Sequence, residues 1–151
     1  MKLLFTVPVL VLLGLLAVAS PRADSQETKA GSSLEVRLNY TGPGTVDAKH
    51  QIFVVLWDSP DFISGGAMPI EILPVSMKDG KVTFTGVKAN PAYFSAAYDP
   101  TGQWDGKSGP PPSGSALGLY SKEAGKPEPV KPDAAKTVSV ELVFDDSIKM
   151  P

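Results

Sequence analysis

The sequence contains no cysteine and a single histidine, His50. Without cysteine the chain has no disulfide, no thiolate metal site and no lipid anchor of the bacterial lipoprotein kind. Histidine-based metal centres usually need several histidines, and a catalytic triad holds its histidine between a nucleophile and a carboxylate. His50 lies in the turn VDAKHQ without such partners. We therefore expect it to be a solvent-exposed loop residue.

Basic clusters and nucleotide motifs are also absent. The chain has 14 Lys and Arg against 16 Asp and Glu, a formal net charge of −2. Nucleic acids and anionic membrane surfaces are bound by concentrated positive charge. No P-loop, dinucleotide fingerprint, zinc-binding helix or nucleophile elbow occurs in the sequence. The sequence therefore predicts neither nucleic acid nor a membrane surface as the partner.

The only long hydrophobic run is at the N-terminus. Lys2 precedes an uncharged, mostly apolar stretch over residues 3–18, which ends in the small-residue motif Ala-Val-Ala. This pattern is typical of a signal peptide, here residues 1–19. Because the run is shorter than the roughly 20 residues of a membrane-spanning helix, we expect no stable membrane anchor after cleavage. An uncleaved anchor is the alternative, since Pro21 lies close to the cut.

The remaining residues suit one exported domain. Residues 20–33 are polar and small, which indicates a flexible, disordered leader. We expect one β-sandwich domain over residues 34–146 and a C-terminal tail over residues 147–151. A disulfide-free exported domain favours the bacterial periplasm or cell exterior.

Alternation of apolar and polar residues predicts strands throughout this domain. A nearly continuous apolar run over residues 51–58 indicates a central strand covered on both faces. Pro74 interrupts residues 70–77 and places that strand at a sheet edge, and Asp79-Gly80 predicts a hairpin after it. The other strands are expected over residues 34–40, 81–87, 92–99, 116–121 and 136–146.

No segment after the signal peptide has helical periodicity. Short strands joined by turn residues predict an all-β fold, a two-layer antiparallel β-sandwich of about seven strands. A small open barrel is the alternative.

The loop DPTGQWD has the spacing of a metal-binding loop. Asp99, Thr101, Gln103 and Asp105 alternate and all carry oxygen, the ligand atom that calcium prefers. The loop departs from the EF-hand pattern, because Trp104 stands where that pattern has glycine. The alternative is a structural loop in which Trp104 folds back over the core.

A ligand site is predicted where aromatic and acidic residues follow two strands. If those strands run parallel in space, their loops meet at one end of the sandwich. Aromatic rings beside acids could then form a platform for a small ligand or sugar. The alternative is that Trp57 and Tyr98 belong to the core and the acids are solvated turn residues. The predicted ligand-binding residues are Trp57, Asp58, Phe62, Tyr98 and Trp104, with Asp61, Asp99 and Asp105 beside them.

The order of these features resembles bacterial extracytoplasmic modules of the transthyretin-like, or prealbumin-like, class, which includes the carboxypeptidase regulatory-like domains. The resemblance rests on IFVVLWDSPDF, KVTFTGVKANPAYFSAAYD, TGQWDGKSGPP and TVSVELVFDD, and it covers residues 34–146. It implies a transthyretin-like or immunoglobulin-like sandwich. Asp99 and Asp105 match acidic positions of the class, whereas Thr101 replaces an asparagine. Such sandwiches serve as carriers, adhesive modules, carbohydrate binders or spacers.

We therefore expect an exported, non-enzymatic binding or interaction module whose partner is an unknown protein or glycan. One alternative is a calcium-stabilised carbohydrate-binding module, with calcium as the one cofactor considered. Another is a small hydrolase that uses loop carboxylates. An interaction module could also recruit its partner by strand addition at the edge strands expected over residues 70–77 or 116–121.

Overall fold

The computed structural model describes residues 31–151, so the predicted signal peptide and most of the predicted leader lie outside the described residues. This range forms seven β-strands and one short 3-10 helix, and it contains no α-helix. None of its helices is long and apolar enough to cross a membrane. The elements are β1 (Ser32–Tyr40), β2 (Ile52–Trp57), η1 (Pro60–Ser64), β3 (Glu71–Val75), β4 (Lys81–Val87), β5 (Tyr93–Tyr98), β6 (Ala116–Leu119) and β7 (Thr137–Phe144).

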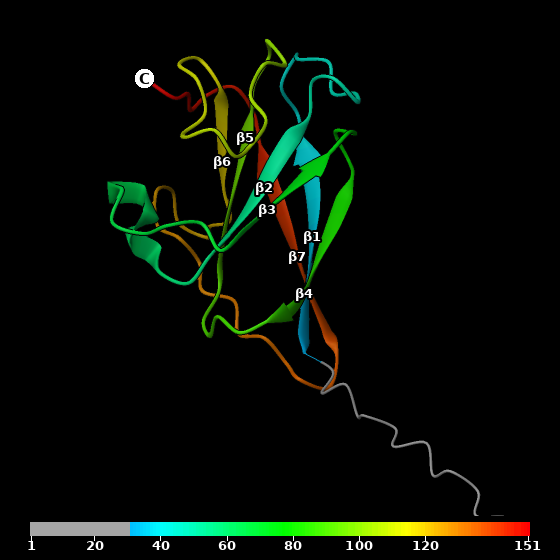
Figure 1. Cartoon of the computed structure of the whole chain (residues 1–151), viewed down its shortest axis with the longest axis vertical. Coiled ribbons are helices and arrows are strands. Elements are labelled where there is room, and N and C mark those ends of the chain that lie inside the picture. The colour runs from blue at the N-terminus through cyan, green and yellow to red at the C-terminus, as the bar shows by residue number, and fades with distance from the viewer. Residues whose placement is uncertain (1–30) are drawn as a thin grey trace, which may run out of the picture.

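The strands form two sheets that pack face to face, as Figure 1 shows. One sheet has the order β4-β1-β7 and the other the order β3-β2-β5-β6. The all-β sandwich prediction is confirmed, and the sheets do not join into a barrel. One pair departs from the antiparallel expectation, because β1 and β7 run parallel from Ser33↔Thr137 to Tyr40↔Phe144. Alternation within a strand fixes its inward face but not the direction of its neighbour.

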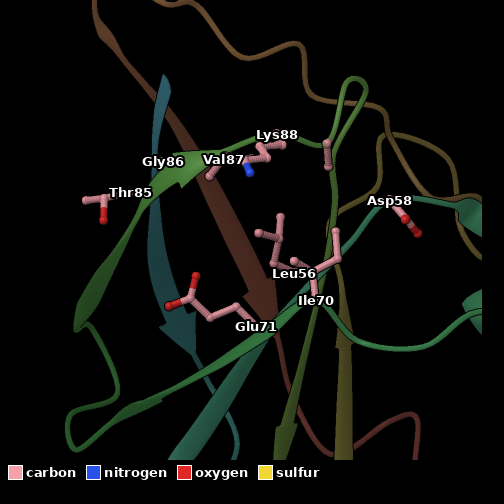
Figure 2. Close-up of a pocket in the computed structure, with 9 residues that line it drawn as sticks. Leu56, Asp58, Ile70, Glu71, Thr85, Gly86, Val87 and Lys88 are labelled. Carbon is pink, nitrogen blue, oxygen red and sulfur yellow. The ribbon is translucent and has the colours of Figure 1, made fainter. Parts of the chain in front are cut away.

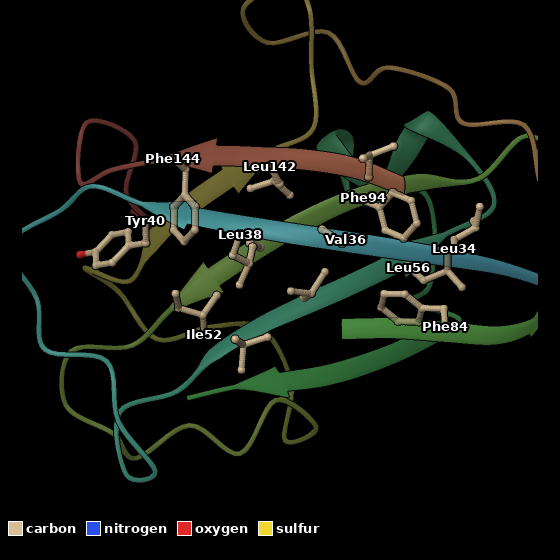
Figure 3. Close-up of a cluster of buried hydrophobic side chains, with 14 of the residues drawn as sticks. Leu34, Val36, Leu38, Tyr40, Ile52, Leu56, Phe84, Phe94, Leu142 and Phe144 are labelled. Carbon is tan, nitrogen blue, oxygen red and sulfur yellow. The ribbon is translucent and has the colours of Figure 1, made fainter. Parts of the chain in front are cut away.

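The core lies between the sheets and follows the predicted alternation. In β1 every second residue is buried, and the residues between them face outward. β7 repeats the pattern, with Leu142 buried and Val143 54% exposed. The cluster shown in Figure 3 combines these two strands with inward residues of β2, β4 and β5, among them Leu34, Val36, Leu38, Tyr40, Ile52, Leu56, Phe84, Phe94, Leu142 and Phe144.

β2 is the covered central strand that its sequence predicts. It pairs with β3 on one side and with β5 on the other. Its even-numbered residues enter the main core, whereas Phe53 and Val55 are 7% and 6% exposed on the opposite face of the sheet. The long loop after β5 accounts for this burial at Phe53, because the Trp104 ring packs edge-on against Phe53 with centroids 4.9 Å apart.

Two edges of the four-stranded sheet are blunted. β3 is an edge strand, as predicted, and Pro74 within it has no N–H for a further strand. β6 is the other edge, and the C-terminal residues cover it through hydrogen bonds from the Leu117 amide to the Ile148 carbonyl and from the Met150 amide to the Ser115 carbonyl. Residues 147–151, set apart as a tail in the sequence analysis, therefore belong to the sandwich. At the other end β1 begins at Ser32, within the expected leader.

The predicted hairpin at Asp79-Gly80 is wrong, although a turn does form there. β3 and β4 belong to different sheets. The Lys78 and Gly80 carbonyls accept hydrogen bonds from β1, at the Tyr40 and Leu38 amides, so the chain crosses to the opposite sheet directly after β3. The edge strands β3 and β4 therefore lie on the same side of the sandwich without hydrogen bonds of a β-ladder between them.

Candidate functional site

The predicted ligand site is divided between opposite ends of the sandwich. β2 and β5 are antiparallel, with Ile52 opposite Tyr98 and Trp57 opposite Tyr93. The loop after Trp57 and the loop after Tyr98 therefore leave from opposite ends of the same sheet. At about 3.3 Å per residue, six residues of β2 separate them by roughly 20 Å. The prediction of one cluster is wrong, because it required the two strands to run parallel.

Asp99 organises the loop at one end. The residue is only 2% exposed. Its carboxylate accepts hydrogen bonds from the Thr101 amide and hydroxyl at 2.7–2.8 Å and from the Gln103 and Trp104 amides at 2.9 Å. Burial by itself would raise the pKa of Asp99, but these hydrogen bonds outweigh it and hold the pKa below its ordinary value. The Asp99 carboxylate thus supplies the acceptors for backbone amides of this loop, which in a strand would bond to a neighbouring strand.

Asp105 performs a similar task nearer the surface. Its carboxylate accepts hydrogen bonds from the Lys107 amide at 2.8 Å, the Ser108 amide at 2.7 Å and the Ser108 hydroxyl at 2.8 Å. These donors lower the pKa of Asp105 to about 2. Within residues 31–151 no three His, Asp or Glu side chains are grouped so that they could hold a metal ion. Both predicted carboxylate ligands, Asp99 and Asp105, are therefore engaged by donors of their own loop.

Trp104 folds back over the sheet, as the structural alternative proposed, but over its outer face. The indole N–H donates to the Gly109 carbonyl at 3.2 Å while the ring contacts Phe53. Gly106 makes this contact possible, because it has φ +74° and a Cβ there would lie 2.5 Å from the Phe53 ring. The ring of Trp104 thus closes the loop onto β2.

Tyr98 points into the core. It is 3% exposed, its hydroxyl donates to the Thr45 carbonyl at 2.8 Å, and its ring lies 5.0 Å from that of Tyr40. Burial raises its pKa. The Tyr40 hydroxyl donates to Asp146, an interaction that the sequence analysis missed. The burial of Tyr98 and the hydrogen bond of its hydroxyl do not favour contact with a ligand. The structure assigns Tyr98 to the core, which was the alternative prediction.

His50 lies 27% exposed by its side chain, with Nδ1 3.0 Å from the Asp47 carboxylate. The Asp47 carboxylate also accepts hydrogen bonds from the His50 and Lys49 amides. These contacts close the turn ahead of β2. His50 therefore has a structural role in this turn, and its ring contacts the Asp47 carboxylate.

At the opposite end, the rings of Trp57 and Phe62 pack together at a corner of the sandwich. Their rings stack with centroids 4.7 Å apart and planes 12° apart. The Trp57 indole N–H donates to the Ser95 hydroxyl at 2.9 Å. The Ser59 hydroxyl accepts from the Asp61 amide at 3.2 Å at the start of η1. One face of Trp57 is therefore covered by its own chain and its only N–H is already bonded.

The loop over residues 59–70, called here the η1 loop, carries exposed apolar side chains beside this corner. Ile63 is 55%, Met68 82% and Ile70 49% exposed. Figure 1 shows the loop projecting from the body of the sandwich. The prolines and the Gly65-Gly66 pair of this stretch are typical of a loop, and the apolar residues Ile63 and Met68 between them are the sequence signal of an apolar surface.

A cleft of about 410 Å³ lies next to the η1 loop, where β3 and β4 separate. Figure 2 shows Leu56 between the end of β4, with Val87 and Lys88, and the β3 side, with Glu71. Within residues 31–151, none of its charged side chains forms a salt bridge. Its lining comprises Leu56, Asp58, Ile70, Glu71, Thr85, Gly86, Val87, Lys88 and Ala89.

Comparison of the sequence with protein-family models and with curated proteins finds no match. The fold defines the protein as a two-sheet β-sandwich. Because one fold can carry many functions, the surface features described above are the evidence for function.

Proposed function

We propose that this protein is an exported, non-enzymatic β-sandwich module that binds a partner protein through the η1 loop. The observation that carries the proposal is the exposure of Ile63, Met68 and Ile70 on a loop whose base is held by the stacked rings of Trp57 and Phe62. Large apolar side chains exposed together on a protein surface are characteristic of interaction sites. Of the six large hydrophobic side chains exposed in residues 31–151, these three fall within one loop.

The base of the loop supports a binding role because it is preorganised. The Phe62 ring is fixed on Trp57, and the helix η1 is capped by Ser59 at its start and by Gly65, with φ +77°, at its end. A loop held in this way loses less conformational entropy when a partner binds. The exposed apolar residues are therefore presented on a fixed support.

Charge around the loop favours a partner with basic groups. Between Lys49 and Lys78 the sequence has three charged residues, all acidic: Asp58, Asp61 and Glu71. The cleft beside the loop adds one cation, Lys88, so acidic groups still predominate there. Acidic groups around an apolar patch disfavour an anionic membrane surface and steer a basic protein surface toward it. We infer a partner with an apolar contact surrounded by Lys or Arg.

The two alternative functions have less support. A carbohydrate platform made of Trp57 and Trp104 together has less support, because their loops leave opposite ends of the sheet and Phe62 covers one face of Trp57. A two-carboxylate hydrolase that combines the loops after β2 and β5 would need groups no more than about 10 Å apart, and these loops leave opposite ends of β2. Export itself is proposed from residues 1–19, and a transthyretin-like relationship from the sequence resemblance over residues 34–146.

A pair of matched variants tests the interaction. The double variant Ile63→Ser/Met68→Ser removes two exposed apolar side chains of the η1 loop, and Val143→Ser removes one of similar exposure, 54%, on β7. Purified proteins are mixed with the extracytoplasmic fraction of the cells that produce them, cross-linked and quantified by mass spectrometry. We expect the double variant to lose the specific partner and the Val143 variant to keep it. Equal recovery by all three proteins would refute the proposal.

Export has its own test. A fusion of residues 1–33 to a reporter enzyme is expected to reach the exterior and to begin at Ser20 after processing. A fusion that stays inside the cell with its N-terminus intact would refute this part of the proposal.

A further inference from the structure

The sandwich has one sheet edge that is both unpaired and open to side chains. β4 pairs only with β1. In an antiparallel ladder alternate residues bond to the same neighbour. The carbonyls of Lys78 and Gly80 bond to β1 just before β4 begins, so Val82 and Phe84 face β1. Beyond Phe84 the register shifts at a bulge, where Gly86 has φ +66°, and Val87 pairs with Ser32. The amides and carbonyls of Lys81 and Thr83 consequently face outward along the free edge, up to the bulge at residues 85–86.

The other three edges lack this combination. Pro74 removes a donor from β3, and the C-terminal residues already bond to β6. The β7 edge is closed against the opposite sheet, because a Cβ at Gly118 of β6 would lie 2.7 Å from the Phe144 ring and 2.9 Å from Leu142. A strand added beside β7 would find no gap for its inward side chains. A strand added beside β4 would face the cleft.

The cleft suits the side chains of such a strand. Its volume of about 410 Å³ lies within the roughly 300–1,000 Å³ of ligand pockets. Leu56 forms an apolar wall with Ile70 and Val87, while Glu71 and Asp58 contribute two carboxylates against the single ammonium of Lys88 (Figure 2). Alternate side chains of an added strand would enter between the sheets, since successive side chains of a strand point to opposite faces.

We infer that the β4 edge and this cleft bind an extended segment of a partner protein by strand addition. The segment's main chain pairs with the outward groups of Lys81 and Thr83, its aliphatic side chains enter the cleft, and a Lys or Arg in it pairs with Glu71. The inference rests on the proposed interaction function, because Ile70 belongs both to the η1 loop and to the cleft.

The test uses two synthetic octapeptides, one alternating valine with lysine and one alternating valine with glutamate. Each is titrated into the isotope-labelled purified protein, and amide resonances are followed by NMR. We expect the valine–lysine peptide to shift the amides of Lys81 and Thr83 at the edge and of Val87 in the cleft, and the valine–glutamate peptide to bind at least about tenfold more weakly. Glu71→Lys should weaken the valine–lysine peptide to a similar extent. Glu141→Lys, the same exchange at an exposed position of β7, should leave its affinity unchanged.

Main-chain pairing is tested on the peptide, so that the protein fold is not altered. N-methylation of alternate residues blocks the donors of one peptide edge at a time. Methylation of one edge should abolish binding and methylation of the other should be tolerated. Binding that tolerates methylation of either edge, or that is unaffected by Glu71→Lys, would overturn the inference. Concentration-dependent shifts of Lys81 and Thr83 without peptide would also overturn it, because a second copy of the chain would then occupy the edge.

The two proposals fail separately. If the peptide does not bind but the partner is still recovered in a manner that depends on Ile63 and Met68, only the strand-addition inference fails. If the peptide binds at β4 but recovery does not depend on the η1 loop, the proposed role of that loop fails.

Discussion

Replacement of Asp99 by alanine should destabilise the protein strongly, although the residue lies in a loop. The carboxylate is the shared acceptor for the amides of Thr101, Gln103 and Trp104 and for the Thr101 hydroxyl. Hydrogen bonds to a charged group contribute about 1.5–3 kcal/mol each, and donors that reach water recover part of this. Because Thr101 and Gln103 are exposed, we expect a net loss of about 3 kcal/mol in the free energy of unfolding.

A loss of that size is easily measured. For a domain of this length it lowers the thermal midpoint by roughly 10 °C. Urea unfolding at pH 7, followed by tryptophan fluorescence and circular dichroism, gives the free energy directly. Asp99→Asn should lose less than Asp99→Ala, because one carbonyl oxygen remains to accept. Asp105→Ala is the matched control and should lose less still, since that carboxylate is exposed. A loss below about 1 kcal/mol for Asp99→Ala would refute the structural role assigned to it.

Three further predictions concern Trp104, the carboxylates of Glu35 and Asp105, and calcium. Trp104→Ala should lower the free energy of unfolding by about 2 kcal/mol in urea, because it uncovers Phe53; unchanged stability would instead favour a ligand role for Trp104. The pKa of Glu35, which accepts a hydrogen bond from Arg37, is lowered to about 2, as is that of Asp105. Because both are depressed in the folded state, their stabilisation is fully present above pH ~5 and is lost as the pH falls toward 2, so an acid titration of stability that declined already above pH 5 would contradict it. Millimolar calcium should leave the thermal midpoint unchanged relative to chelator, and a calcium-dependent rise would restore the predicted metal site.

The strands and the core could be predicted from the sequence because both depend on local alternation. Leu34 to Tyr40 and Val138 to Phe144 each place every second side chain in the core, and Pro74 marks an edge as predicted. A period of two residues determines which face of a strand is apolar, and no distant residue is needed to recognise it.

The site could not be predicted in the same way because it depends on how strands are paired. Trp57 and Tyr98 both end apolar strands, and only the antiparallel register of β2 and β5 separates them. The burial of Phe53 requires Trp104, a residue 51 positions later in the chain, to fold back over the sheet. The Asp79-Gly80 turn is local, but whether the strand after it pairs with β3 or with β1 is decided by long-range hydrogen bonds.

The proposed binding surface is tested most directly by site-specific photo-crosslinking in the cells that produce the protein. A photoreactive amino acid is placed at Met68 of the η1 loop and, in a separate protein, at Val143 of β7, and both proteins are checked for unchanged thermal unfolding. The account predicts a discrete cross-linked partner from position 68 and none from position 143. The same product from both positions, or none from position 68 while position 143 yields one, would contradict it.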